Sequence, residues 1–422
     1  MNHSFPLLTH KFFNTPKIPK SKFCITFVLI LLIGCSSTKR LTTNNNVFTT
    51  NAIRVLLENS SSDLAISVND LLIISDEEKV LAKVKAGNKL FFNIKSEKII
   101  LKIGEREFFS KNFFITGSDE ADILKINNKK YRGRIVISIN NSEIKIVNQI
   151  GLEDYVKGVM IKEMPIGKGL ENYQALKAFS ICVRTFAFNK MQENKSFFDV
   201  YPDTRDQVYG GVEGESEMTN QIVDETDSQL LFFDNKPATI FYHSTCGGQT
   251  ENVSNVFGKS EISYLAGIKD GEEPYCKISP RYKWVENYTQ TVFINRLFKT
   301  KLIDSENFNI VGINVKSRFK SGRVDELEIN LSDFDGNPKI VTMRSNQIRS
   351  IIRDSEGKSI LKSTLFDIRI DEQNNIIISG KGNGHGVGLC QWGAIGQSRS
   401  NIDFRKILNH YYPGTEIKNI YD

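Results

Sequence analysis

One carboxyl residue lies on the apolar face of a predicted helix. Residues 151–163 read GLEDYVKGVMIKE. In a helix the apolar side chains of this segment share one face, and they are Leu152, Tyr155, Val156 and Val159. Glu163 comes eleven residues after Leu152 and continues that face. Pro165 disfavours helical backbone at the residue before it, so the helix should end beside Glu163.

This position allows two interpretations of Glu163. A partly desolvated carboxyl group has a raised pKa, which a general acid needs at neutral pH. Alternatively, Glu163 is a structural residue that pairs with a buried cation such as Arg184. The helix alone does not decide between them.

A second segment with chemical potential is GKGNGHGVGLCQWGAIG, residues 380–396. Glycine weakens regular structure, so the run needs a geometric reason, either tight turns or backbone that approaches a ligand closely. On the second interpretation His385 offers a hydrogen-bond donor, Gln391 an amide and Trp392 a stacking face. On the first, His385 is a hydrogen-bonded structural residue. Trp392 fits a core position equally well.

The chain has six cysteines. Cys24 and Cys35 lie near the N-terminus and Cys182 lies in a predicted helix, which leaves Cys246, Cys276 and Cys390. His243 and Cys246 have an H-x-x-C spacing, and Cys276 follows thirty residues later. His243, Cys246 and Cys276 could bind zinc together with a fourth ligand. In an oxidising compartment Cys246 and Cys276 could instead form a disulfide. The sequence favours the state without metal slightly. Cys182 should be buried in its helix, and Cys390 is assigned no role.

The first residues resemble an export signal. Basic residues precede an apolar run, residues 23–33, that is too short to span a bilayer and ends at Gly34 and Cys35. This pattern predicts a lipoprotein signal peptide over residues 1–34, lipidation of Cys35 and a polar tether over residues 35–50. The alternative is a simple signal peptide. Either one places the protein in the cell envelope, and lipidation would anchor it to a membrane, facing the cell wall.

The charge balance argues against nucleic-acid binding. The whole chain has 55 basic and 49 acidic residues, and four of the lysines precede Cys35. The remaining 51 basic residues give a net charge of about +2, which is too small for an electrostatic nucleic-acid surface.

The elements that must position these residues predict an α+β fold. Residues 51–129 contain short alternating apolar runs and should form a small β-rich module of unknown role. Residues 130–422 should form the second domain, with helices at 151–163 and 168–195 and β structure after residue 230. We expect a central helical core beside a groove.

Several motifs occur in an order that resembles a known family. They are LEDYVKGVMIKEMP, ALKAFSICVRTFA, DTRDQVYGGV, FYHSTCGGQTENVSNVFG, SYLAGIKD, SPRYKW and GKGNGHGVGLCQWGAIG followed by ILNHYYPGTEI. Together they resemble the family of stage II sporulation protein D and the amidase enhancers. The resemblance covers roughly residues 130–422 and is specific only in combination.

The resemblance implies a lytic transglycosylase that cleaves peptidoglycan glycan strands at N-acetylmuramic acid, with Glu163 in the catalytic position. One carboxyl group would act as acid and then as base, leaving a 1,6-anhydro end. The glycines would let the backbone run beside the sugar chain. The expected substrate-binding residues are Arg184, Gln207, Tyr209, His243, Ser244, His385, Gln391 and Trp392. Stem-peptide-free strands are the expected substrate.

Two rival functions are compatible with the same residues. A branch of the family suggests a non-catalytic, glycan-binding lipoprotein that recruits or stimulates a cell-wall amidase. A zinc amidase using His243, Cys246 and His385 is the weaker rival, because these residues lack the spacing and the acidic base of known hydrolase motifs. Some members of the family carry zinc and others lack the cysteines, and Glu163 chemistry requires no cofactor.

Overall fold

The structure of the protein is a computed structural model that describes residues 52–60, 66–67, 71–85, 88, 90–119, 121–193 and 197–420. The predicted signal peptide, Cys35 and the tether lie outside these residues. Within the described part of the chain no helix has the length and apolar character needed to cross a membrane.

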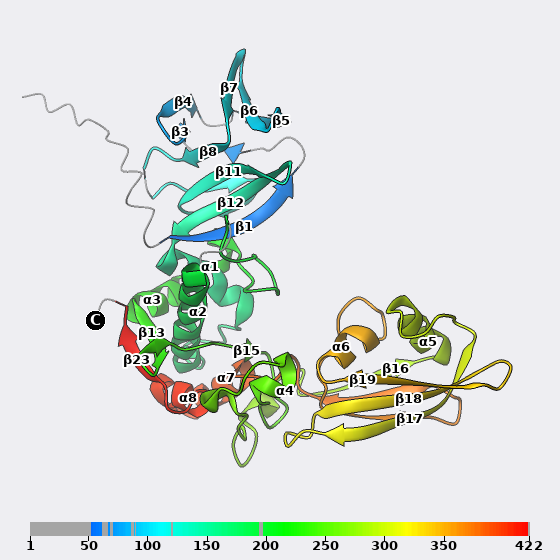
Figure 1. Ribbon diagram of the computed structural model, residues 1–422. Helices are drawn as coiled ribbons and strands as arrows, with labels where there is room; N and C mark the ends of the chain where they lie inside the picture. Colours follow the sequence, from blue (N-terminus) through cyan, green and yellow to red (C-terminus); the bar gives the residue numbers. More distant parts are fainter. Residues whose placement is uncertain are drawn as a thin grey trace, which may run out of the picture. The chain divides into compact units, whose positions relative to one another are not determined.

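The N-terminal part is built from three antiparallel sheets (Figure 1). The largest has the strand order β1-β12-β11-β8-β3-β4, and the smaller ones are β10-β9-β2 and β5-β6-β7. Their bounds are β1 Ala52–Ser60, β2 Ile66–Ser67, β3 Leu71–Ser75, β4 Val80–Lys85, β5 Phe91–Lys95, β6 Lys98–Ile103, β7 Arg106–Ser110, β8 Asn112–Thr116, β9 Leu124–Ile126, β10 Lys129–Tyr131, β11 Arg134–Asn140 and β12 Glu143–Gly151.

The largest sheet crosses the domain boundary that the sequence predicted between residues 129 and 130. Strand β12 pairs with β1 from Gly151 opposite Ala52 to Ile144 opposite Ser60, and β11 pairs with β8. Buried side chains of this sheet belong to the same apolar core as those of the helices after β12. Alternating apolar residues identified the strands, but their pairing across the chain joins the predicted module to the second domain.

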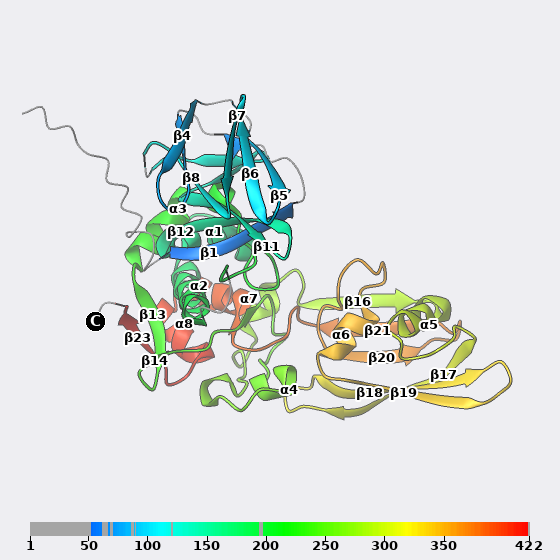
Figure 2. The ribbon, with the colours of Figure 1, turned by 45° about the horizontal axis from the view of Figure 1, so that its top comes forward.

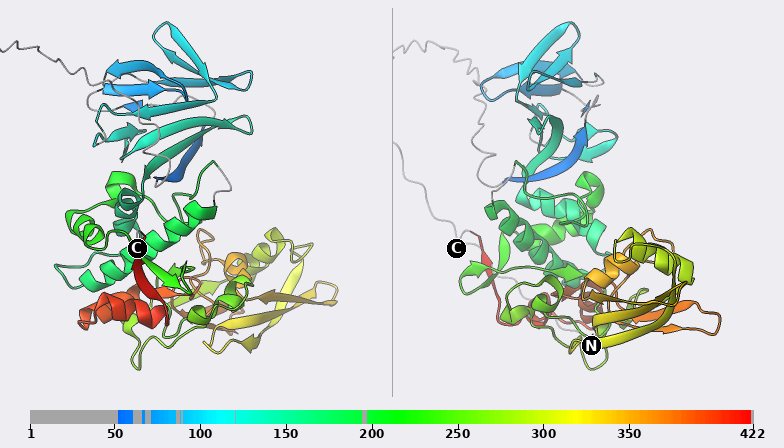
Figure 3. Two further views of the ribbon diagram at one scale, coloured as in Figure 1. Left: turned by 60° about the vertical axis from the view of Figure 1, so that its left-hand side comes forward. Right: turned by 45° about the vertical axis from the view of Figure 1, so that its right-hand side comes forward.

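The helical part begins directly after β12. Helix α1 spans Leu152–Glu163, α2 spans Tyr173–Glu193 and α3 spans Glu217–Glu225. The apolar face predicted for the first helix is buried, at Leu152, Tyr155, Val156 and Val159. Helix α2 contacts α1, α3 and the C-terminal helices α7 (Gln391–Arg399) and α8 (Phe404–Tyr411), which are red beside the green helices in Figure 3. The C-terminal residues therefore complete the core around α2.

The segments before and after residues 283–381 pair with each other. Strand β15 (Tyr242–His243) runs parallel to β22 (Leu389–Cys390), with His243 opposite Cys390. Strand β13 lies between β14 and β23 in a separate antiparallel sheet. The remaining bounds of this part are β13 Gln229–Phe233, β14 Lys236–Pro237, α4 Val253–Phe257 and β23 Glu416–Asn419.

Residues 283–381 form their own apolar core, and Figure 2 shows the strands and helices of this segment. Two three-stranded antiparallel sheets, β16-β21-β20 and β17-β18-β19, and helices α5 and α6 supply it. Their bounds are β16 Lys283–Tyr288, α5 Gln290–Lys299, β17 Phe308–Arg318, β18 Val324–Asp333, β19 Pro338–Arg344, α6 Gln347–Ile352, β20 Phe366–Ile370 and β21 Ile376–Lys381. Lys283 pairs with Lys381, so this insertion begins and ends at neighbouring strand positions. Sheets and helices in separate segments make the protein α+β, as predicted.

Candidate functional site

Glu163 is the last residue of α1, where the sequence predicted the helix to end. Met164 has extended backbone, with φ −132° and ψ 132°, because Pro165 follows it. The Glu163 side chain is half-buried, whereas Met164 beside it is fully buried. The carboxyl group therefore lies at the border between the apolar core and solvent.

The groups around Glu163 are electrically neutral. Its Oε1 accepts a hydrogen bond from the backbone N–H of Val208 at 2.6 Å. The side-chain amide of Gln391 donates to the Glu163 backbone carbonyl at 3.0 Å. Among the described residues no lysine, arginine or histidine forms an ion pair with this carboxyl group. The structural alternative, pairing with a buried cation, is thus not what the geometry shows.

Burial raises the pKa of Glu163 above its usual value. The Val208 N–H, the Gln391 amide and the Tyr242 hydroxyl act in the opposite direction and do not cancel it. The Tyr242 hydroxyl is buried without a hydrogen bond of ordinary geometry within the described chain. Burial and the nearby Glu163 carboxylate both raise the pKa of this tyrosine, which keeps its proton. The site can hold a protonated carboxyl group beside three neutral hydrogen-bond donors.

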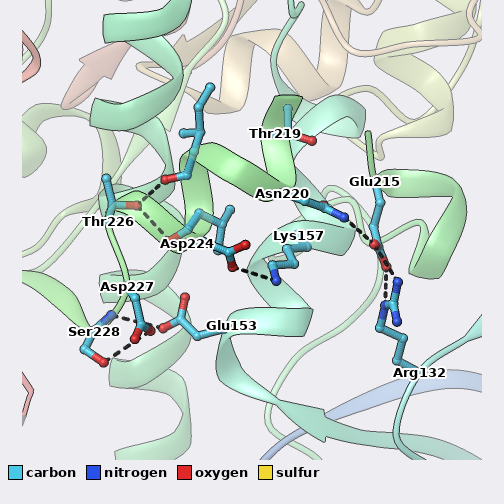
Figure 4. Close-up of polar contacts among 12 residues, drawn as sticks. Arg132, Glu153, Lys157, Glu215, Thr219, Asn220, Asp224, Thr226, Asp227 and Ser228 are labelled. Carbon is cyan, nitrogen blue, oxygen red and sulfur yellow. Dashed lines mark hydrogen bonds and ion pairs between the residues drawn. The ribbon is translucent and has the colours of Figure 1, made fainter. Parts of the chain in front are cut away.

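Arg184 has a structural role in place of the expected substrate contact. Its guanidinium is fully buried and donates to Glu153 at 2.6–3.0 Å and to the carbonyls of Gln229 and Val223. Glu153 also accepts from the Ser228 N–H, as Figure 4 shows. The resemblance placed Arg184 on the substrate, but its donors are directed into the packing of α1 against α2 and the segments around Val223 and Gln229.

Gln207 and Tyr209 are also buried. The side-chain Oε1 of Gln207 accepts from the Tyr155 hydroxyl at 3.0 Å, and the Tyr209 hydroxyl donates to the side-chain Oδ1 of Asn148 at 2.8 Å. Both side chains flank Val208, whose N–H binds Glu163. Their observed contacts position that N–H, so they act on the site through the backbone and offer little surface to a glycan strand.

The two histidines share one backbone partner. The His243 Nδ1–H donates to the Val387 carbonyl at 3.1 Å, and the His385 Nδ1 accepts from the Val387 N–H at 3.0 Å. Burial lowers the pKa of His385 to about 3 and also lowers that of His243, so both rings are neutral. His385 packs against the ring of Phe257 at 5.3 Å. The hydrogen-bonded structural histidine is therefore the interpretation that fits His385.

Ser244 and Trp392 meet through the backbone. The Trp392 N–H donates to the Ser244 carbonyl at 3.0 Å. Trp392 is half-buried against the main apolar core, and Ser244 is half-buried as well. Both retain exposed surface within the two segments that pair at β15 and β22. Of the expected substrate-binding residues, these two and half-buried His385 remain partly exposed.

The glycines between residues 380 and 388 lie against the protein itself. Gly388 has φ +70°, and a Cβ there would lie 2.0 Å from the Phe241 carbonyl oxygen. Gly386 has φ +89°, and its Cβ would meet the guanidinium of Arg323 at 2.7 Å. Where the sequence suggested close approach of backbone to a ligand, the backbone approaches other parts of the protein, among them Phe241 and Arg323. Positive φ and lack of space explain these glycines.

The predicted zinc ligands are only partly brought together. Cys246 and Cys276 are buried and unbonded, with their sulfur atoms 3.4 Å apart. His243 is not in their cluster; Asp270 and Cys390 are. The reason is the parallel pairing of β15 and β22, which places Cys390 beside the strand that precedes Cys246. Cys182, as predicted, is buried in α2.

Three contributors to these sites were missed from the sequence. Val208 acts through its backbone N–H, which no side-chain pattern indicates. Tyr242 stands beside His243 in the motif FYHSTCGG and could have been singled out as its neighbour. Asp270 closes the motif SYLAGIKD, but only the fold brings it to Cys276.

Comparisons with known proteins place this site in context. The sequence model of a family described as "Stage II sporulation protein" matches residues 140–233, which include α1, α2 and Val208. A second family, "Domain of unknown function (DUF8618)", matches residues 269–388, which include the insertion.

Three bacterial proteins illustrate the similarity. The chain is 32% identical to an uncharacterized protein of Brachyspira hyodysenteriae over 71% of this chain and 75% of the relative. It is 26% identical to stage II sporulation protein D of Bacillus subtilis over 67% of this chain and 79% of that protein. It is 28% identical to the amidase enhancer of Bacillus subtilis over 62% of this chain, but spans only 40% of the enhancer.

Proposed function

Because the chain belongs to the stage II sporulation protein D family, we propose that it is a peptidoglycan lytic transglycosylase with Glu163 as its catalytic residue. The supporting observation is a half-buried carboxyl group with a raised pKa, no ion-pair partner in the described chain and neutral donors around it. Such a group can be protonated at the start of a reaction and ionised in the middle of it.

The proposed reaction needs one carboxyl group. Protonated Glu163 donates its proton to the glycosidic oxygen as the bond to C1 of N-acetylmuramic acid breaks, and positive charge develops at C1. The carboxylate then takes the proton of the muramic acid 6-hydroxyl, whose oxygen bonds to C1. The products are a new sugar 4-hydroxyl end and a 1,6-anhydro end, and no water is consumed.

The neighbours of Glu163 support both stages. The Val208 N–H stabilises the carboxylate formed after the first proton transfer, and Tyr242 and the Gln391 amide lie close enough to lower its pKa. Burial opposes ionisation and returns the group to the acid form for the next turnover. We assign Gln391 and Tyr242 as positioning residues of this carboxyl group.

A second candidate function rests on the similarity to an amidase enhancer. In this alternative the protein binds glycan strands and stimulates a cell-wall amidase without cleaving the strands. The partly exposed Ser244 and Trp392 would then contact sugar, and Glu163 would need no proton. We also propose, from the sequence alone, that lipidation at Cys35 anchors the protein in the cell envelope.

The test is mass spectrometry of the products from stem-peptide-free glycan strands. Wild type should release fragments with 1,6-anhydro ends, which are one water lighter than hydrolysis products, and Glu163→Gln should release none. Asp154→Asn, which also changes a carboxyl group of α1 to an amide, is the matched control and should cleave like wild type.

Each other outcome contradicts part of the proposal. Hydrolysed ends would replace the lytic route with attack by water. Equal release by the Glu163→Gln variant would remove Glu163 from the mechanism. A folded wild type that releases no fragments but accelerates a purified amidase would establish the second candidate function.

A further inference from the structure

Four potential metal ligands converge in the core, about the segments that pair at β15 and β22. They are Cys246, Asp270, Cys276 and Cys390. All four side chains are fully buried, and their ligand atoms lie within 4.8 Å of one another. They come from three separate parts of the chain. Three thiols and a carboxyl group in an apolar core need either bonds or a cation to offset their polarity.

The dimensions of the cluster fit a tetrahedral cation. Zinc–sulfur bonds of about 2.3 Å at tetrahedral angles place two sulfur atoms about 3.8 Å apart. The Cys246 and Cys276 sulfur atoms are 3.4 Å apart, and neither is bonded to another cysteine. Three sulfur ligands with one carboxylate suit zinc, which accepts both donor types and favours thiolate.

The surroundings of the cluster stabilise anionic ligands. Backbone N–H groups are directed at the sulfur atoms, with Cys246 N 3.1 Å and Gly393 N 3.3 Å from the Cys390 sulfur. The Asp270 carboxylate accepts from the Tyr411 hydroxyl at 2.6 Å and from the Cys276 N–H at 2.8 Å. Such contacts orient metal ligands and hold them in their ionised form.

A buried cation nearby has no carboxylate within ion-pair distance among the described residues, and buried Glu251 acts on it only from farther away. Arg323 is 1% exposed and donates to the carbonyls of Cys246 and Gln249, at 2.6 and 2.8 Å. Among the described residues it forms no ion pair, and its Nε has no hydrogen-bond partner. A zinc ion held by three thiolates and a carboxylate has a net negative charge, which would offset the guanidinium. The single positive charge of the guanidinium would thus offset part of the negative charge of the site.

We propose that Cys246, Asp270, Cys276 and Cys390 bind one zinc ion as a closed structural site. This replaces both His243 as a ligand and the Cys246–Cys276 disulfide. Four protein ligands leave no open coordination position, so the zinc takes no part in chemistry. Its role is to join the segments at residues 246, 270–276 and 390, which are distant in sequence.

The proposed zinc site is linked to Glu163 through Gln391. Cys390 caps helix α7 by accepting from the Gly393 N–H, and the next residue, Gln391, donates to the Glu163 carbonyl. Zinc at Cys390 would fix the start of α7 and hence the Gln391 amide. Zinc binding itself does not depend on the proposed reaction, so it can hold even if the lytic route fails.

The test is the metal content of the purified, folded chain, measured by elemental analysis after dialysis against metal-free buffer. Wild type should retain about one zinc per chain. Cys276→Ser and Cys390→Ser should each lose most of it, and Asp270→Asn should weaken retention. Cys182→Ser is the matched control, because Cys182 is also a buried cysteine and lies outside the cluster; it should retain zinc fully.

Cobalt substitution provides a readout that does not require folded variants. Cobalt(II) bound to wild type in place of zinc should show the sulfur-to-metal charge-transfer absorption of a thiolate site. In addition, Cys246, Cys276 and Cys390 should resist alkylation until a chelator is added.

Three results would overturn the proposal. One is a folded wild type, grown with zinc, that contains no bound metal. Another is a denatured mass lower by two hydrogens with Cys246 and Cys276 in one cross-linked peptide, which would establish the disulfide. The third is zinc that survives Cys390→Ser but is lost in His243→Ala, which would restore the ligand set expected from the sequence.

Discussion

Helix α1 carries a half-buried glutamate at each end, and the two have different partners. Glu153, in the first turn, receives three hydrogen bonds from buried Arg184. Glu163, the last residue, receives one backbone N–H and has no cation beside it in the described structure. Burial raises the pKa of both groups. The two groups differ in the charge of their neighbours and in the end of the helix dipole at which they lie.

The comparison shows how one helix can hold a fixed anion and a titrating acid. The positive end of the helix dipole lies at Glu153 and favours its carboxylate, whereas the negative end lies at Glu163 and disfavours ionisation there. The guanidinium fixes Glu153 in one place and one charge state. Glu163 has no such cation, and burial raises its pKa, which favours the protonated form. The same residue type is structural at one end and suited to catalysis at the other.

Among substitutions at the two glutamates, the largest expected effect is that of Glu163→Gln on the reaction rate. Glu163→Gln preserves the size of the side chain and an acceptor for Val208 but cannot transfer a proton, so turnover should fall by roughly 10²–10⁴-fold. Fragment release should be measured over time with both proteins at equal folded concentration. A loss smaller than about tenfold would show that Glu163 is not the acid.

The next effect is on stability at the other end of the helix. Glu153→Gln leaves the Arg184 cation buried without a counter-charge, and the free energy of unfolding should fall by about 2–3 kcal/mol. This is below the full cost of breaking a buried pair, because the Glu153 side chain is 30% exposed. Urea unfolding measures it, and cleavage per folded molecule should be unchanged.

A second ion pair of helix α1, with its acidic partner on α3, provides a matched control. Lys157 pairs with Asp224 of α3, whose side chain is 64% exposed (Figure 4). Asp224→Asn should therefore change stability by less than about 1 kcal/mol. Equal losses of stability from Asp224→Asn and Glu153→Gln would contradict this explanation. They would mean that burial of the Arg184 guanidinium does not make the Glu153 pair more important than the exposed pair.

The smallest effect is a pH dependence of stability. The pKa of Glu163 is higher in the folded than in the unfolded chain, so wild type and Glu163→Gln should behave alike at pH values below the unfolded pKa of about 4.3. As the pH rises through the folded pKa, wild type loses stability that the variant keeps. The melting temperature of the variant should therefore rise relative to that of wild type as the pH increases towards 7. A gap that stays constant or narrows would contradict the raised pKa.

The sequence was most informative where structure is local. The spacing from Leu152 to Glu163 and the position of Pro165 predicted the helix, its buried face and its end, because each depends on neighbours within a few residues. Glu163 was identified for the same reason, with the family motif in addition. Burial of Cys182 was predicted from the same kind of pattern.

The sequence was least informative where segments that are distant along the chain meet. Cys390 received no role, and Asp270 was not considered, because their neighbours are set by the pairing of β15 with β22 and by the loop at residues 270–276. Arg184 was expected on the substrate because a family motif contains it, but no pattern in the sequence indicates that Glu153 is its partner. The glycines correctly indicated that the backbone closely approaches other groups, but the sequence did not show that these groups belong to the protein itself.

The separation of Gln391 from Glu163 has a consequence for biosynthesis. These residues are 228 positions apart, and the contact of Cys246 with Cys390 closes a loop of 144 positions. A chain synthesised from its N-terminus can form α1 and α2 early, but these contacts must wait until α7 has been made. Bringing such distant segments together is an entropically costly, late step. The candidate site is therefore completed only when nearly the whole polypeptide has been synthesised, so any activity that depends on it is absent from a nascent chain.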